Sequence, residues 1–202
     1  NAINFLLSAN MAGIVGVVFA SILALPVPFA PVHLLFINLL TDSLPAIAIG
    51  VEPATGDLLE QKPRDPKEPI LTGSLLRRIF VYGLLIACAT MAAYFVGLRA
   101  GGGGLAMTLA FATLTLARLF HGFNCRGEKS IFSLGLLTNK ASLAAFAAGV
   151  VLLAAVLLIP GLNGLFEVVP FTGVQLGLVV LLAFLPTLVI QLYKSIRTAV
   201  KR

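Results

Sequence analysis

Six long apolar runs dominate the sequence. Each has close to the roughly 20 apolar residues that an α-helix needs to cross the hydrocarbon core of a bilayer. Backbone groups in lipid can only be satisfied within the spanning segment, so these runs predict helices. The predicted spans are about 3–25, 29–50, 75–98, 104–124, 141–159 and 172–193. The predicted fold is therefore all-α, a polytopic membrane protein built as a bundle of six transmembrane helices.

The composition excludes an ordinary soluble domain. Hydrophobic residues make up 59% of the chain and charged residues only 11%, too few charges to cover a soluble surface. The net charge of +6 does not indicate a nucleic-acid partner, because the basic residues lie between apolar runs and form no basic face with interleaved aromatics. The expected surroundings are membrane lipid, and no nucleic acid is expected as a partner.

The basic residues indicate the direction in which the helices cross. Cytoplasmic connections of membrane proteins are enriched in Lys and Arg. If six spans alternate, all 14 basic residues except Arg99 and Arg118 fall on the side of the loop 51–74, the connection 125–140 and the C-terminal tail. Arg99 lies on the opposite side, and Arg118 lies inside a span. Both termini and the loop 51–74 are therefore expected to be cytoplasmic.

One acidic and one basic residue lie inside the predicted spans, Asp42 and Arg118. Ionisable groups within a bilayer are costly and usually functional. Asn38 and Thr41 precede Asp42 at spacings that an α-helix places on one face, which gives the oxygen ligands that hard cations prefer. Pro45 removes a backbone hydrogen bond to Thr41, and local unwinding there would free carbonyl oxygens for the same site. The alternative is a polar helix–helix contact beside a proline kink.

Other polar residues in the spans allow more than one interpretation. Asn10 on the first span is either a further ligand or an interhelical hydrogen-bonding group. His33 and His121 lie near span ends without a second His or Cys at ligand spacing, so they are expected at the membrane interface rather than on a metal. Cys88 and Cys125 are expected to be free thiols.

Two stretches of the sequence resemble the calcium pumps of the P-type ATPase family. The run NLLTDSLPAIAIGVEP covers residues 38–53, and the run PRDPKEP covers residues 63–69. In that family the sixth transmembrane helix carries an N-x-x-T-D ligand cluster, and the loop after it carries a similar proline-rich signature. The resemblance extends less specifically over the whole chain, whose spans would be family helices five to ten. Asn1 would fall partway along the fifth helix, so the chain is expected to be a fragment of a longer protein.

The resemblance also implies the roles of individual residues. The positions that match family ion ligands are Asn38, Thr41, Asp42 and Asn10. Family members with two calcium sites carry glutamates where this chain has Gly13 and Arg118. The expected function is therefore ion binding and translocation in an ATP-driven pump, with calcium exported through a single intact site. Arg118 and Pro45 are expected to modulate that site.

The pump family implies partners that lie outside this chain. Its members are phosphorylated by ATP on the aspartate of a D-K-T-G motif, and this sequence contains neither that motif nor a G-x-x-x-x-G-K-[ST] loop. ATP and magnesium are therefore expected to bind only to domains absent from this chain, so the chain alone would not hydrolyse ATP. The expected partners are the remaining helices and cytoplasmic domains of the same pump. The Ala-, Leu- and Gly-rich composition favours a bacterial plasma membrane.

Three alternatives are compatible with the same residues. Half of a secondary transporter would also contain six helices, although no inverted repeat is evident in the sequence. A P-type pump for manganese, sodium or protons would use the same oxygen ligands. A membrane scaffold that transports nothing would pair Asp42 with Arg118 for structure alone. A D-K-T-G motif upstream in the parent gene would exclude the secondary transporter and the scaffold.

Overall fold

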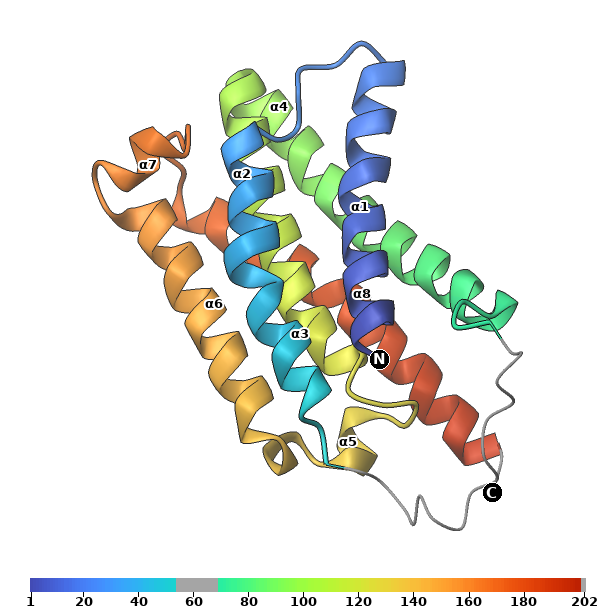
Figure 1. Cartoon of the computed structure of the whole chain (residues 1–202). Coiled ribbons are helices and arrows are strands. Elements are labelled where there is room, and N and C mark those ends of the chain that lie inside the picture. Colours follow the sequence, from blue (N-terminus) through green and yellow to red (C-terminus); the bar gives the residue numbers. More distant parts are fainter. Residues whose placement is uncertain (54–68, 201–202) are drawn as a thin grey trace.

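The computed structural model is a bundle of long helices and describes residues 1–53 and 69–200. Within these ranges there are helices and no strands, and Figure 1 shows the long helices packed side by side. In the described part of the chain, five helical stretches are long and apolar enough to cross a membrane. One of them, Pro31–Gly50, is divided into shorter segments. The other four are α1 (Ala2–Ile22), α4 (Gly73–Asn124), α6 (Lys140–Leu158) and α8 (Gly173–Val200). The predicted all-α membrane fold is confirmed.

The predicted spans 75–98 and 104–124 are the two halves of α4, which turns back on itself at the glycines between them. The backbone leaves helical geometry at Gly101 and at Gly102, where φ is 76°, a left-handed value that glycine adopts without steric cost. The halves then pack very closely, because a Cβ atom on Gly97 would lie 2.7 Å from the Cα atom of Ala106. Figure 1 shows this turn at the upper end of the bundle. The expected glycine turn is therefore the tip of a helical hairpin.

The predicted span 29–50 is divided into three helical segments. In chain order these are α2 (Pro31–Phe36), the π-helical turn η1 (Ile37–Thr41) and α3 (Ser43–Gly50). In η1 the Asp42 N–H donates to the Ile37 carbonyl, five residues back, at 2.8 Å. Pro45 has no N–H to donate to the Thr41 carbonyl. The distortion expected beside Pro45 thus takes the form of a wider turn, and the chain does not unwind into coil.

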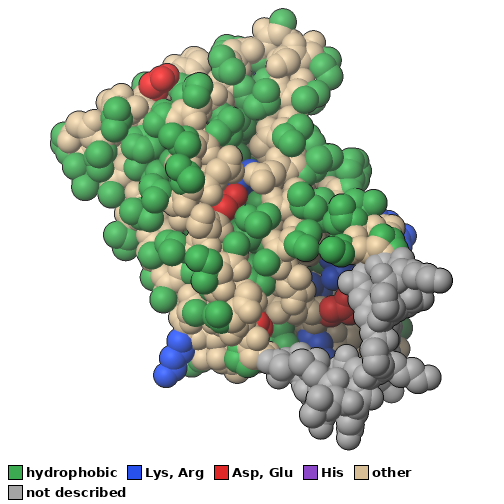
Figure 2. Space-filling view, in the orientation of Figure 1, with side chains coloured by type: hydrophobic (Ala, Val, Ile, Leu, Met, Phe, Trp, Pro, Cys, Tyr) green, Lys and Arg blue, Asp and Glu red, His purple; other side chains and the backbone are tan. Residues whose placement is uncertain are grey.

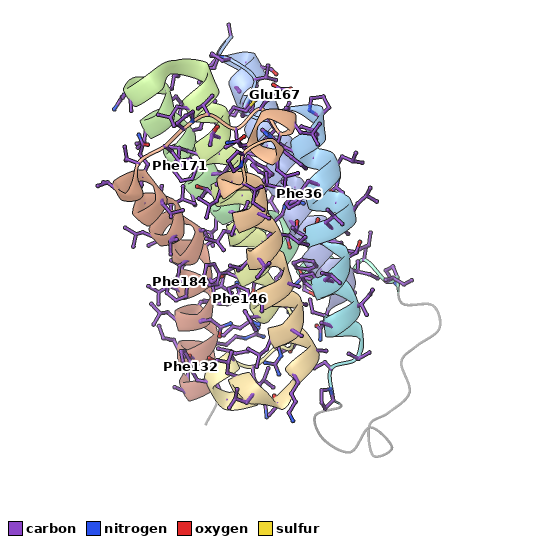
Figure 3. All side chains as sticks on the ribbon, turned by 90° about the vertical axis from the view of Figure 1, so that its left-hand side faces the viewer. Phe36, Phe132, Phe146, Glu167, Phe171 and Phe184 are labelled. Atoms are coloured by element: carbon purple, nitrogen blue, oxygen red, sulfur yellow. The ribbon has the colours of Figure 1, made fainter. Side chains whose placement is uncertain are left out.

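The connections contain short helices that the sequence did not predict. They are α5 (Ile131–Leu134), the 3₁₀ turn η2 (Leu136–Thr138) and α7 (Leu162–Leu165). Figure 3 shows Phe132 of α5 and Glu167, just after α7, at opposite ends of the molecule. The two connections therefore lie at the two ends of the bundle, as alternating spans require. The loop signature at 63–69 lies outside the described residues except for its last position.

The second half of α4 forms the centre of the bundle. Every residue from 108 to 119 is buried, as expected for a helix that is apolar on all sides and surrounded by other helices. The outer surface is also largely apolar, and Figure 2 shows hydrophobic side chains over most of one face, with most charged atoms toward its lower part. A surface of this kind is suited to lipid, with the charged groups outside the hydrocarbon. The chain is an integral membrane protein.

Candidate ion-binding site

The two ionisable residues of the spans form a buried ion pair. Arg118 Nη1 donates to Asp42 Oδ2 at 2.7 Å, and each side chain is only 2% exposed. Asp42 lies between η1 and α3, while Arg118 lies in the central half of α4. Loss of either partner would leave an uncompensated charge in a low-dielectric interior, which is strongly unfavourable. The structure therefore joins residues 76 positions apart in the sequence, a pairing that the sequence already allowed.

The guanidinium of Arg118 also contacts α1. Its Nη2 atom donates to the Ala9 carbonyl at 2.5 Å and to Asn10 Oδ1 at 3.3 Å. A Cβ atom on Gly13 would lie 3.4 Å from the same Nη2 atom. The two positions that differ from the two-site family pattern, Gly13 and Arg118, are therefore neighbours. The small residue on α1 leaves room for the large cationic one on α4.

One oxygen of the buried carboxylate has no partner among the described residues. Asp42 Oδ1 is buried and accepts no hydrogen bond there, whereas Oδ2 is used by Arg118. Buried polar atoms are usually hydrogen-bonded, so an unpartnered carboxylate oxygen requires an explanation. A hard cation would supply the missing interaction, because calcium binds carboxylate oxygens directly. The residues present thus fit a cation at Asp42.

The other predicted ligands are only partly gathered around Asp42. Thr41 is fully buried, and its hydroxyl donates to the Ile37 carbonyl at 3.0 Å, which leaves its oxygen able to accept. Asn10 is half-buried beside Arg118. Asn38 is exposed, and its side chain makes no hydrogen bond within residues 1–53 and 69–200. The ligand role of Asn38 therefore stays a prediction, as do those of Thr41 and Asn10.

Asn38 is exposed, although helical spacing places it near Asp42 on one face. Asn38 and Thr41 lie within the π turn η1, and Asp42 follows it directly. Thr41 and Asp42 are buried. The π turn does not explain the difference, because hydrogen bonds to the fifth residue widen the turn and keep positions four apart on nearly the same face.

The two histidines, expected at the membrane interface, are enclosed by protein. Both are fully buried. His33 Nε2 donates to the Phe166 carbonyl at 2.6 Å, and its ring stacks on that of Phe111 with centroids 4.1 Å apart. His121 lies 2.8 Å from Ser8 Oγ through its Nε2 atom. Both rings therefore serve as packed, hydrogen-bonded connections between distant segments.

A buried polar cluster between α4 and α8 was missed in the sequence. Asn124 Nδ2 donates to Thr187 Oγ1 at 2.9 Å, and Gln191 Nε2 donates to Asn124 Oδ1 at 2.8 Å. Gln191 Oε1 in turn accepts from the backbone N–H of Ile131 at 2.9 Å. The signal that could have revealed this cluster is the i, i+4 spacing of Thr187 and Gln191 on an otherwise apolar helix. The cluster holds the ends of α4 and α8 together.

Comparison with known proteins places these features in a family. The family described as "Cation transporting ATPase, C-terminus" matches residues 26–196. A calcium-transporting ATPase of Bacillus subtilis (strain 168) is 37% identical over 187 residues, which cover 92% of this chain and 21% of the relative. Calcium-transporting ATPase 1 of Bacillus cereus is 35% identical over 96% of this chain and 24% of the relative.

A third relative extends the same pattern. A calcium-transporting ATPase of Listeria monocytogenes is 36% identical over 83% of this chain and 19% of the relative. The chain thus spans about a fifth of the length of the curated relatives it matches. The family match covers most of the chain and includes the segment that carries Asp42 as well as the hairpin that carries Arg118. The chain therefore belongs to the family of cation-transporting ATPases, of which it is the C-terminal membrane domain.

Proposed function

We propose that this chain is the ion-binding and translocating membrane part of an ATP-driven calcium pump. Family membership supports a cation pump, and the matched relatives are named as calcium-transporting ATPases. The observation that carries the proposal is the buried Asp42 carboxylate, with Oδ1 unpartnered among the described residues. Within the described part of the chain, Arg118 satisfies only Oδ2, so Oδ1 still lacks the partner that a buried carboxylate oxygen ordinarily has. Calcium is the transported substrate in this proposal.

The proposed site is completed from outside this chain. Calcium takes about six to eight oxygen ligands, and the candidates here are Asp42, Thr41, Asn10 and Asn38. The resemblance places a further ligand on the fourth helix of the pump, which precedes this chain. Asn38, outward-facing here, would then lie toward the preceding helices. Manganese or sodium would use the same oxygen donors, and ion competition in the transport assay distinguishes them.

We also propose that the pump carries one calcium ion per cycle. The Arg118 guanidinium lies against Gly13 and bonds to Asn10 and Asp42. The two-site family pattern has glutamates at the positions of Gly13 and Arg118, and both are absent here. The guanidinium replaces the negative charge that a second divalent cation would need, while Asp42 Oδ1 stays open to the first. The same guanidinium neutralises Asp42 when no cation does so. Coupled measurement of calcium uptake and ATP hydrolysis in sealed vesicles should give one calcium per ATP, and two would contradict the proposal.

The proposed topology places both termini and the loop 51–74 in the cytoplasm, where the remaining domains of the pump would bind ATP and magnesium. The basic residues concentrate at that end of the bundle, as the charge rule for cytoplasmic connections requires. The bacterial relatives support a bacterial plasma membrane as the location.

The test of the calcium site is Asp42→Asn in the full-length pump. This change keeps the size of the side chain but removes the charge and one metal-binding oxygen, so calcium-dependent phosphorylation by ATP should be lost. Glu167→Gln is the matched control, because Glu167 lies in the connection after α7, away from the pair. Size-exclusion chromatography would establish that both variants are folded. An unchanged calcium dependence in Asp42→Asn would refute the assignment.

A further inference from the structure

A groove opens between the beginning of α4 and the end of α8, away from the Asp42 site. Figure 1 shows both of these helix ends at the lower right of the bundle. The cavity between them has a volume of about 660 Å³. Among the described residues, its lining includes the side chains of Arg77, Arg78, Lys194 and Arg197 and one carboxylate, that of Glu128. The groove is therefore strongly cationic at the end of the bundle that carries most of the basic residues.

Two of the cations are already engaged by the protein. Arg78 Nη2 pairs with Glu128 Oε1 at 3.1 Å. Lys194 is buried, and its Nζ atom donates to the carbonyls of Asn124 and Gly127, each at 2.6 Å. The lysine therefore holds the C-terminal end of α4 in place and forms a fixed cationic wall of the groove.

The other two cations are free to meet a ligand. Arg77 and Arg197 are exposed, one on each of the two helices, and neither makes an ion pair with any residue that the structure describes. Both guanidinium groups line the same groove, and the Glu128 carboxylate, which also lines it, pairs with Arg78 rather than with either of them. Like charges brought together in this way attract an anion.

The groove becomes apolar farther along both helices. Val81 and Leu85 follow the arginines of α4 by one and two turns, and Val189 and Ile190 precede Arg197 by about two turns on α8. Val81 is 45% exposed and Val189 is 44% exposed, so apolar surface is open to an occupant. Tyr193 lies between the cationic and apolar parts, the depth at which amphipathic rings are common in membranes.

We propose that this groove binds one anionic phospholipid, with its phosphate between Arg77 and Arg197 and an acyl chain along Val81 and Val189. A soluble anion would neutralise the arginines but would leave the apolar walls uncovered. A zwitterionic lipid would cover the walls but would bring no net negative charge. Basic pockets between transmembrane helices on the cytoplasmic side are suited to anionic headgroups. The order of cationic and apolar walls matches the order of phosphate and acyl chain in a phospholipid.

The test uses the full-length pump that contains this domain, delipidated in detergent and examined by native mass spectrometry. Phosphatidylglycerol and phosphatidylcholine are added separately, and bound lipid is counted as a function of concentration. Phosphatidylglycerol should bind to the wild type with a stoichiometric site that phosphatidylcholine does not fill. Arg77→Gln/Arg197→Gln should weaken this binding about thirtyfold, because each Lys or Arg near an anionic lipid contributes roughly fivefold.

Two further variants distinguish lipid binding in the groove from nonspecific attraction of anionic lipid to the basic surface. Lys129→Gln/Lys140→Gln removes the same charge from exposed positions outside the groove lining and should leave the site unchanged. Val81→Trp/Val189→Trp fills the apolar part, keeps all charges and should also weaken lipid binding. Equal loss in the Lys129/Lys140 control would overturn the proposal. The proposal would also be overturned if the tryptophan variant bound lipid as well as the wild type does. Displacement of the lipid by soluble glycerol phosphate would likewise overturn it and would assign the groove to a free anion.

Discussion

Arg126 and Glu52 form a two-point ion pair at one end of the bundle. Arg126 Nη2 lies 2.7 Å from Glu52 Oε1, and Arg126 Nε lies 2.8 Å from Oε2. Arg126 is buried and also donates to the carbonyls of Gly135 and Leu136, each at 3.2 Å. Asn139 Nδ2 donates to Glu52 Oε2 at 2.5 Å. The end of α3 is therefore fixed to the connection between α4 and α6.

We expect the stability of the domain to depend on pH through Glu52. Burial acts to raise the pKa of Glu52, but the hydrogen bonds from Arg126 and Asn139 outweigh it and lower the pKa from its ordinary value. A carboxylate with a lowered pKa stabilises the fold at neutral pH, and this contribution is lost as pH falls through the folded-state pKa. Glu52→Gln should therefore cost about 3 kcal/mol near pH 7 and much less at pH values below that pKa.

The measurement for Glu52→Gln is thermal unfolding in detergent across pH, followed through the buried thiol of Cys125 in a Cys88→Ser background. Glu128→Gln is the matched control, because the Glu128 side chain is 72% exposed in its pair with Arg78 and an exposed pair contributes little. A cost for Glu52→Gln that does not change with pH would contradict the prediction.

The Asp42–Arg118 pair should show strong non-additivity. Arg118→Met and Asp42→Leu each leave the other charge buried without its partner and should each cost about 3–5 kcal/mol of stability. The double variant replaces the pair with apolar side chains, so its cost should be well below the sum. The same Cys125 assay measures all three variants. Additive costs would show that the two charges do not stabilise each other.

The hairpin of α4 should depend on the absence of a side chain at position 97. Gly97→Ala places a Cβ atom 2.7 Å from the Cα atom of Ala106, so the two halves must move apart, at a cost of about 1–3 kcal/mol. Gly177→Ala is the control, because nothing lies within 4 Å of a Cβ atom built there. That change should be neutral or slightly stabilising, since alanine favours a helix more than glycine does. Similar effects of the two changes on the unfolding temperature would count against the close approach.

The topology should be visible in thiol labelling of intact cells. Gly164→Cys, in α7, should react with an impermeant reagent added outside, whereas Lys140→Cys, at the start of α6, should react only after the cells are opened. Both positions are exposed, and the native cysteines are replaced by serine in the background. Labelling of position 140 from outside would reverse the assigned orientation.

The sequence predicted the helices well because the apolar runs have the length that a bilayer requires. It also singled out Asp42 and Arg118, since charges inside such runs are rare and conspicuous. The fold pairs them, as expected when the spans contain one carboxylate and one guanidinium that each need a partner. The hairpin between Gly97 and Ala106 depends on packing across the turn, so the glycine run predicted a turn but not the close contact.

Two features of the site could not be obtained from the sequence. The π turn η1 depends on how the segment packs, and helical spacing alone does not indicate that Asp42 is buried while Asn38 is exposed. The hydrogen bonds of Asn124 with Thr187 and Gln191 join residues 63 and 67 positions apart. The i, i+4 spacing of Thr187 and Gln191 marks a polar face on one helix, but it does not identify Asn124 as the partner on another.

The π turn also makes the two ends of the Asp42–Arg118 pair unequal. Arg118 stands in the enclosed half of α4, where residues on all sides hold the helix in place. Asp42 stands at the junction of η1 and α3, where the Ile37 carbonyl accepts from both the Asp42 N–H and the Thr41 hydroxyl, and where Pro45 supplies no donor. The backbone that carries Asp42 is therefore less regular than the backbone that carries Arg118. The guanidinium is the more firmly enclosed partner of the pair.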